Sequence, residues 1–206
     1  MLSINVEGDV KNNQFYSNVR GKTGLPQEII YSLLRVQGRK HVLKTENIKN
    51  DALTDSLRDK GFTIADQSRL GRSGSERKEN YKSGELDLLI LDSGGDILSI
   101  IEALELIHLD RKTIKKHIYK LLNRYDTAGN EENFVVVYSK SDRFEELWTK
   151  YKKFVDHKVF PVEEDIEELE MPKARIKGGR NYYLVNNKKL CLYHLFVDVS
   201  LGDSTN

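Results

Sequence analysis

The chain has 206 residues, a length that fits one principal domain with a sizeable core. Apolar residues make up 38% of the chain and charged residues 32%, a polar but globular composition that excludes disorder throughout. The 33 lysines and arginines nearly balance the 32 aspartates and glutamates, so any affinity for nucleic acid must come from local basic clusters.

The N-terminal part of the chain predicts an arm followed by two helices. Residues 1–24 are polar and mixed, which is typical of an arm. Residues 26–38 carry a proline suited to a first turn, apolar residues at helical spacing and a final glycine, and therefore predict a helix. A second helix is predicted for residues 51–60, with Asn47 or Asn50 as its cap.

The middle of the chain predicts strands. Residues 62–65 alternate like a strand, and residues 86–91 and 97–104 are nearly continuous apolar runs of the kind found in a sheet covered on both faces. Residues 134–138 predict another buried strand. Between the first two strands, residues 69–82 form a basic, Gly/Ser-rich loop that either contacts a DNA backbone or is a mobile surface hairpin.

Two further helices and a late hairpin complete the pattern. Residues 110–125 predict a basic amphipathic helix, and residues 143–155 predict an aromatic-rich one. After the acidic run at residues 163–170, residues 181–199 predict a hairpin. Its concentration of apolar residues marks it as a candidate surface for a homo-oligomer or a partner protein.

The single cysteine, Cys191, excludes an intramolecular disulfide and a cysteine-based zinc site. One cysteine in an apolar run fits a reduced, cytoplasmic setting. No apolar stretch is long enough to span a bilayer, and residues 1–5 lack the features of a signal peptide. We therefore expect a soluble cytoplasmic protein without a membrane partner.

Two carboxylates near the ends of neighbouring strands are the main functional signal. If the strands pair across the turn at residues 92–96, Asp87 and Glu102 come close enough to hold one oxygen-liking cation such as Mg²⁺ or Mn²⁺. Glu85 shares the strand face of Asp87 and is an additional candidate ligand. Solvated strand-end carboxylates are the alternative, although charges inside apolar strands are unusual without a partner.

These residues and the order of elements resemble the PD-(D/E)xK, or restriction-endonuclease-like, nuclease superfamily over residues 26–138. The resemblance implies an α/β fold with a central mixed sheet flanked by helices, an αβββαβ core with an added helix and hairpin. It also implies that Asp87 and Glu102 bind the metal, with Glu28 on the first helix or Glu85 assisting. An acid in a first helical turn also complements the helix dipole, so Glu28 has an alternative explanation.

The resemblance fails at Leu104, where the family carries a lysine that positions or activates the attacking water. Some members of the superfamily supply the basic group from the following helix. The helical stripe places Lys115 on one flank and His117 on the other, within reach of the site, whereas Lys116 and Lys120 are expected to face solvent. Loss of activity is the alternative.

We expect residues 25–160 to form a nuclease-like core, with residues 161–206 as an acidic linker and a hairpin packed on it. The expected function is Mg²⁺-dependent cleavage of DNA rather than RNA. By analogy alone, a role in defence against phages or other foreign genomes is the natural setting. The alternative is a catalytically inactive module of the same fold that binds nucleic acid or a protein.

Overall fold

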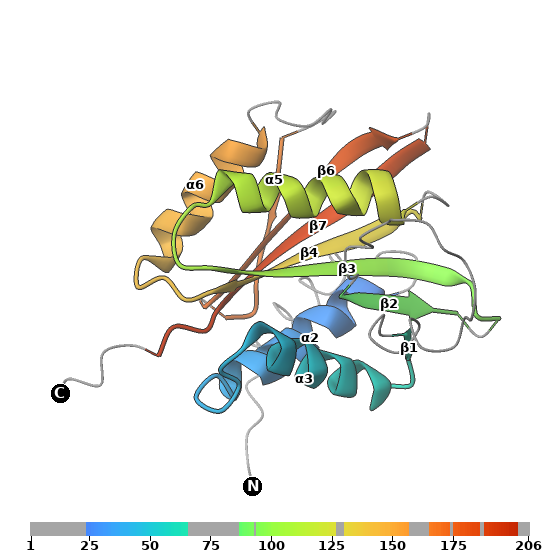
Figure 1. The fold of residues 1–206 in the computed structure, drawn as a ribbon, viewed down its shortest axis with the longest axis horizontal. Coiled ribbons are helices and arrows are strands. Elements are labelled where there is room, and N and C mark those ends of the chain that lie inside the picture. The colour runs from blue at the N-terminus through green and yellow to red at the C-terminus, as the bar shows by residue number, and fades with distance from the viewer. Residues whose placement is uncertain are drawn as a thin grey trace, which may run out of the picture.

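The computed structural model shows a mixed α/β fold in which one twisted sheet lies between two helical layers (Figure 1). The structure describes residues 24–65, 87–92, 94–126, 130–156, 165–173, 175–185 and 188–201. None of the helices in these ranges is long and apolar enough to cross a membrane.

The sheet has seven strands in the order β1-β2-β3-β4-β7-β6-β5. Its centre is parallel, because β3 pairs with β4 and β4 with β7 in the same direction, and all other neighbours are antiparallel. The strands are β1 (Thr63–Ala65), β2 (Leu88–Leu91), β3 (Ile97–Leu106), β4 (Glu132–Ser139), β5 (Glu167–Leu169), β6 (Ile176–Val185) and β7 (Lys188–Asp198). All the predicted strands are present, and β5, which comes from the acidic run, is an addition.

The first two helices, α2 (Leu25–Gly38) and α3 (Glu46–Arg58), pack side by side on one face of the sheet (Figure 1). Helix α2 begins one residue before its predicted start and ends at the predicted Gly38, but α3 begins five residues earlier than predicted. Its cap is Thr45, whose hydroxyl accepts a hydrogen bond from the Ile48 amide at 3.3 Å. A threonine with a donor three residues on is a good cap, so the helix starts there rather than at either asparagine.

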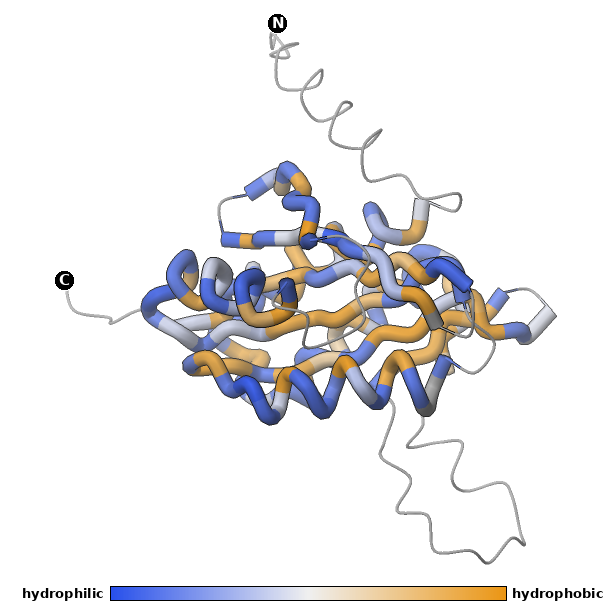
Figure 2. The backbone as a smooth tube through the Cα atoms, turned by 90° about the horizontal axis from the view of Figure 1, so that it is seen from above, coloured by the Kyte–Doolittle hydropathy of each residue, from blue (hydrophilic) through white to orange (hydrophobic). Residues whose placement is uncertain are grey.

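The other face is covered by α5 (Arg111–Lys120), which runs on into a π-helical turn at Leu121–Tyr125, and by α6 (Phe144–Asp156). Side chains alternate between the two faces along each strand, so Ile101 joins the core under α2 and α3 while Ile100 joins the core under α5 and α6. Figure 2 shows the result, with hydrophobic residues along the central strands and hydrophilic ones on the outer turns of the helices.

The late hairpin completes the central sheet instead of packing on it as an extension. Strand β7 lies directly beside β4, with Leu195 opposite Val136. One continuous sheet therefore joins the two sides of the boundary that was expected at residue 160. Most apolar side chains of the hairpin are buried in the two cores, which removes the original reason for treating it as an oligomer surface.

Candidate metal centre

The site lies at the N-terminal end of β2, beyond which, among the described residues, β3 has no neighbouring strand on that side. Leu88 is the first residue of β2 and pairs with Ile101, so Asp87 stands at the point where pairing stops. The Oδ2 atom of Asp87 accepts a hydrogen bond from the backbone amide of Ala103 at 2.7 Å. The carboxylate thus satisfies an edge amide that would otherwise lack a strand partner.

A second carboxylate accepts a hydrogen bond from the β3 backbone two residues further along the strand. The Oε2 atom of Glu46, in the first turn of α3, accepts a hydrogen bond from the Glu105 amide at 2.9 Å. The early start of α3 at its Thr45 cap is what brings this glutamate to the sheet edge. The N-terminus of α3 and the end of β2 therefore supply neighbouring carboxylates on one strand edge.

The third carboxylate, Glu102, is fully buried and faces α5. Its Oε1 atom lies 2.8 Å from Nδ1 of His117 and 3.9 Å from Nζ of Lys120. The contact with His117 is within hydrogen-bond distance but lacks hydrogen-bond geometry. Three buried atoms have no hydrogen-bond partner among the described residues: the two carboxylate oxygens of Glu102 and Nδ1 of His117. Ligand atoms of Asp87, Glu102 and His117 all lie within 4.8 Å of one another.

Burial and mutual repulsion dominate the electrostatics of this cluster. Burial, followed by the charge of Glu102, raises the pKa of Asp87 to about 7, and the Ala103 amide offsets only part of that rise. Burial also raises the pKa of Glu46. Carboxylates that repel one another in a poorly solvated position are stabilised by an added positive charge, which makes the cluster suited to a cation.

A neighbouring ion-pair network is electrostatically complete. The carboxylate of Glu105 contacts Nζ of Lys49 at 2.5 Å and Nζ of Lys140 at 2.6 Å. Burial alone would raise the pKa of Glu105, but hydrogen bonds from the two lysines lower it overall. Both lysines therefore form their ion pairs with Glu105.

The structure brings three predicted site residues together and leaves two, Glu28 and Lys115, apart. Asp87, Glu102 and His117 meet at the end of β2, as their spacing predicted. Glu28, expected to assist them, is not in this group: its carboxylate pairs with Nζ of Lys60, just after α3, at 2.7 Å. Glu46 occupies the place expected for that helical acid. A threonine directly followed by a glutamate was the sequence signal for it, hidden by the late predicted start of α3.

The basic residues of α5 are also arranged differently from the prediction. Lys115 is exposed and forms no ion pair with the described residues of the cluster, whereas Lys120, expected to face solvent, approaches Glu102. Lys120 follows His117 by three positions, so both lie on the same flank of the helix. Leu104 is 1% exposed in the core under α5. Glu85 and the loop at residues 69–82 lie outside the described residues.

Comparison of the chain with models of protein families, with curated proteins and with solved structures gives no match. The resemblance to restriction-endonuclease-like nucleases therefore rests on the residues and the order of elements in this chain.

Proposed function

We propose that this protein is a divalent-metal-dependent nuclease of the restriction-endonuclease-like type, with Asp87, Glu102 and His117 as metal ligands. The observation that carries the proposal is the state of Glu102. Both its oxygens are buried without a hydrogen bond from any residue that the structure describes, and Oε1 faces the imidazole of His117 within a cluster of further acids. Buried charges are stable when they are paired or when they coordinate a metal, and this carboxylate has only incomplete pairing.

The donor set indicates which cation fits. Two carboxylates and one imidazole suit Mn²⁺ better than Mg²⁺, because Mg²⁺ takes oxygen ligands almost exclusively while imidazole binds later transition metals well. A bound divalent cation would polarise a phosphodiester and lower the pKa of an attacking water. We therefore name Mn²⁺ as the first choice and Mg²⁺ as the second.

The remaining residues of the site have defined tasks in this proposal. Glu46 holds the edge of β3 and adds negative charge beside the ligands, which strengthens cation binding. Lys120 brings its ammonium group to 3.9 Å from Glu102 and takes the place of the lysine that Leu104 replaces. From there it can orient a water molecule and offset charge that develops on the phosphate. DNA is the proposed substrate.

One observation favours a second candidate, an inactive nucleic-acid-binding module of the same fold. Leu104 is embedded in the apolar core under α5, so the position that carries the catalytic lysine in the family is closed to solvent. If Lys120 does not act in its place, the metal centre binds a cation but lacks a basic group for cleavage.

The test is cleavage of labelled single-stranded DNA, double-stranded DNA and RNA in the presence of Mn²⁺ or Mg²⁺. We expect the wild-type chain to cut DNA with Mn²⁺, and Asp87→Asn and Glu102→Gln to lose this activity while keeping their fold by circular dichroism. Absence of cleavage of every substrate with both metals would refute the nuclease. Mn²⁺ binding without cleavage would then favour the inactive module.

A further inference from the structure

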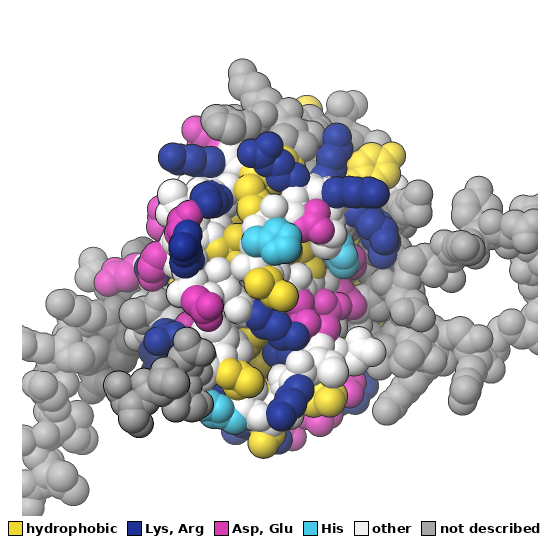
Figure 3. Space-filling view, turned by 60° about the vertical axis from the view of Figure 1, so that its left-hand side comes forward, with side chains coloured by type: hydrophobic (Ala, Val, Ile, Leu, Met, Phe, Trp, Pro, Cys, Tyr) yellow, Lys and Arg dark blue, Asp and Glu magenta, His cyan; other side chains and the backbone are white. Residues whose placement is uncertain are grey.

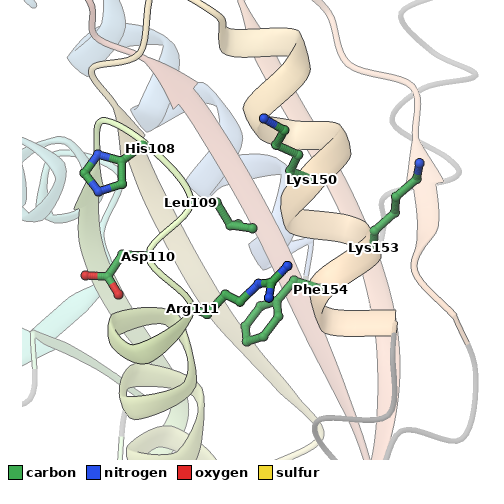
Figure 4. A pocket seen from close by; sticks show the side chains of 7 residues that line it. All are labelled: His108, Leu109, Asp110, Arg111, Lys150, Lys153 and Phe154. Atoms are coloured by element: carbon green, nitrogen blue, oxygen red, sulfur yellow. The ribbon is translucent and has the colours of Figure 1, made fainter.

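A concave surface lies on the other side of α5 from the metal centre, between the β3–α5 connection and α6 (Figure 4). It has a volume of about 1140 Å³ and is open to solvent. We call it the α5–α6 groove. Its lining residues are His108, Leu109, Asp110, Arg111, Lys150, Lys153 and Phe154.

The charge of the α5–α6 groove is positive. Arg111 and Lys153 have no ion-pair partner among the residues that the structure describes, and Lys150 pairs with Glu146 at 2.6 Å. Asp110 is acidic, but its carboxylate caps the N-terminus of α5. One of its oxygens accepts hydrogen bonds from the amides of Lys112 and Thr113, and the other accepts one from the Thr113 hydroxyl.

An aromatic ring lies beside these cations. The guanidinium of Arg111 reaches from the start of α5 across the groove to Phe154 on α6, 5.8 Å from the ring centre (Figure 4). This contact favours one orientation of the planar cation, which reduces the entropy lost when it binds an anion. The space-filling view, with this end of the molecule turned forward, shows Lys and Arg side chains gathered over its upper half (Figure 3).

The groove is separate from the metal centre. Ile114 and Ile118 mark the buried stripe of α5, and a rotation of 100° per residue places Arg111 on one flank of that stripe and His117 on the other. The two residues are six apart, or about 9 Å along the helix axis. The metal centre, with carboxylates from β3 and from the residue before β2, and the basic groove therefore lie on opposite flanks of α5.

We propose that the α5–α6 groove binds a single strand of nucleic acid, with Arg111 and Lys153 on its phosphates and Phe154 against a base. An open groove of this volume fits an extended chain better than a small anion, which pockets usually enclose more fully. Cations that follow a groove beside an aromatic ring are the arrangement that holds single strands without sequence preference. The choice of nucleic acid over another polyanion rests on the proposed function.

The experiment measures fluorescence anisotropy of a labelled 20-nucleotide single strand with the full chain in EDTA, so that no metal-dependent cleavage occurs. We expect Arg111→Glu and Lys153→Glu each to weaken binding by about tenfold at 0.1 M salt, and to reduce the slope of log affinity against log salt by about one. We expect Phe154→Leu to weaken single-strand binding by a few fold and to leave duplex binding unchanged, since only unpaired bases can stack.

The matched control is Arg39→Glu, which makes the same charge change at an exposed arginine of the α2–α3 surface. Circular dichroism verifies that all four variants are folded. The inference is overturned if the wild-type chain does not bind the strand, or if Arg111→Glu and Arg39→Glu bind it equally well. Tighter binding of a duplex than of the single strand, with no effect of Phe154→Leu on either, would also overturn it.

The outcomes for the two proposals are distinguishable. A chain that binds the strand through the groove but never cleaves it with Mn²⁺ would refute the nuclease and leave the groove assigned. If the chain cleaves DNA but Arg111→Glu and Arg39→Glu bind the strand with the same affinity, the nuclease is supported and the groove assignment is refuted.

Discussion

Nδ1 of His117 lies 2.8 Å from Oε1 of the fully buried Glu102, yet the two atoms form no hydrogen bond. The pair joins α5 to β3 and faces Asp87 across the end of β2. A divalent cation coordinated by these two atoms would satisfy both, so the contact fits a metal site better than a simple ion pair.

Removing the imidazole should change the metal preference of the site. We expect His117→Ala to lower Mn²⁺ affinity by roughly tenfold or more, and Mg²⁺ affinity by less, because Mg²⁺ gains little from a nitrogen ligand. Isothermal titration calorimetry of both metals gives the two affinities. The exposed His41 provides the control variant His41→Ala. Equal losses for both metals would argue against a metal–imidazole bond.

The two helical acids should differ in their importance. Glu46 lies beside the ligands, whereas Glu28 pairs with Lys60. We expect Glu46→Gln to weaken Mn²⁺ binding by roughly 10- to 100-fold, the usual cost of disturbing groups that surround a metal. Glu28→Gln should bind Mn²⁺ like the wild-type chain. The measurement is the Mn²⁺ dependence of the melting temperature, and the opposite ranking would restore the assignment made from the sequence.

The lysines of α5 offer a test of catalysis that leaves the ligands unchanged. We expect Lys120→Ala to reduce the rate of DNA cleavage by roughly 10²- to 10⁴-fold while Mn²⁺ affinity changes little. Lys115→Ala removes the same charge from an exposed position and should cleave at the wild-type rate. Single-turnover kinetics at saturating Mn²⁺ separates the rate from binding. Equal rates for the two variants would show that Lys120 is not the substitute for the missing lysine.

Placing a lysine at position 104, where restriction-endonuclease-like nucleases carry one, should damage the fold. Leu104 is 1% exposed among apolar side chains, so we expect Leu104→Lys to lower the free energy of unfolding by on the order of 3 kcal/mol. Leu104→Met, which keeps the volume, should cost less than about 1.5 kcal/mol. Urea unfolding measures both. A stable Leu104→Lys variant with faster cleavage would mean that the lysine amine reaches Glu102 after all.

A buried histidine on β7, two strands away from Glu102 in the sheet, should make stability depend on pH. Nδ1 of His194 accepts a hydrogen bond from the Tyr151 hydroxyl at 2.8 Å, and its Nε2 donates to Oδ1 of Asn181 at 2.9 Å. Burial lowers the pKa of His194 to about 3 from an ordinary 6.5. Between these two pH values His194 is protonated only in the unfolded chain. Its contribution to stability is therefore constant above pH 6.5 and falls as the pH drops towards 3.

We expect this loss to be on the order of 1 kcal/mol per pH unit within that window. In His194→Phe the pH dependence should be flatter, although the variant loses two hydrogen bonds and is less stable at neutral pH. His41→Gln, at an exposed histidine, is the control. Urea unfolding from pH 4 to 8 tests this, and identical slopes for wild type and His194→Phe would contradict a neutral His194.

The sequence by itself determined the elements and the approximate place of the site. Apolar periodicity located α2, α5 and α6 and the strands, because burial of one helix face or of both strand faces leaves a direct mark in the residue pattern. The short turn between β2 and β3 fixed the pairing that sets Asp87 beside Glu102. These are local relationships, and spacing alone decides them.

Only the tertiary structure decided which distant residues join that pair. The choice of Glu46 over Glu28 depends on how α3 crosses the sheet edge, and the choice of Lys120 over Lys115 on the rotation of α5 about its axis. The place of β7 beside β4 likewise comes from packing across the chain. Side-chain spacing along one element does not encode these long-range arrangements, because they follow from how the two cores pack against the sheet.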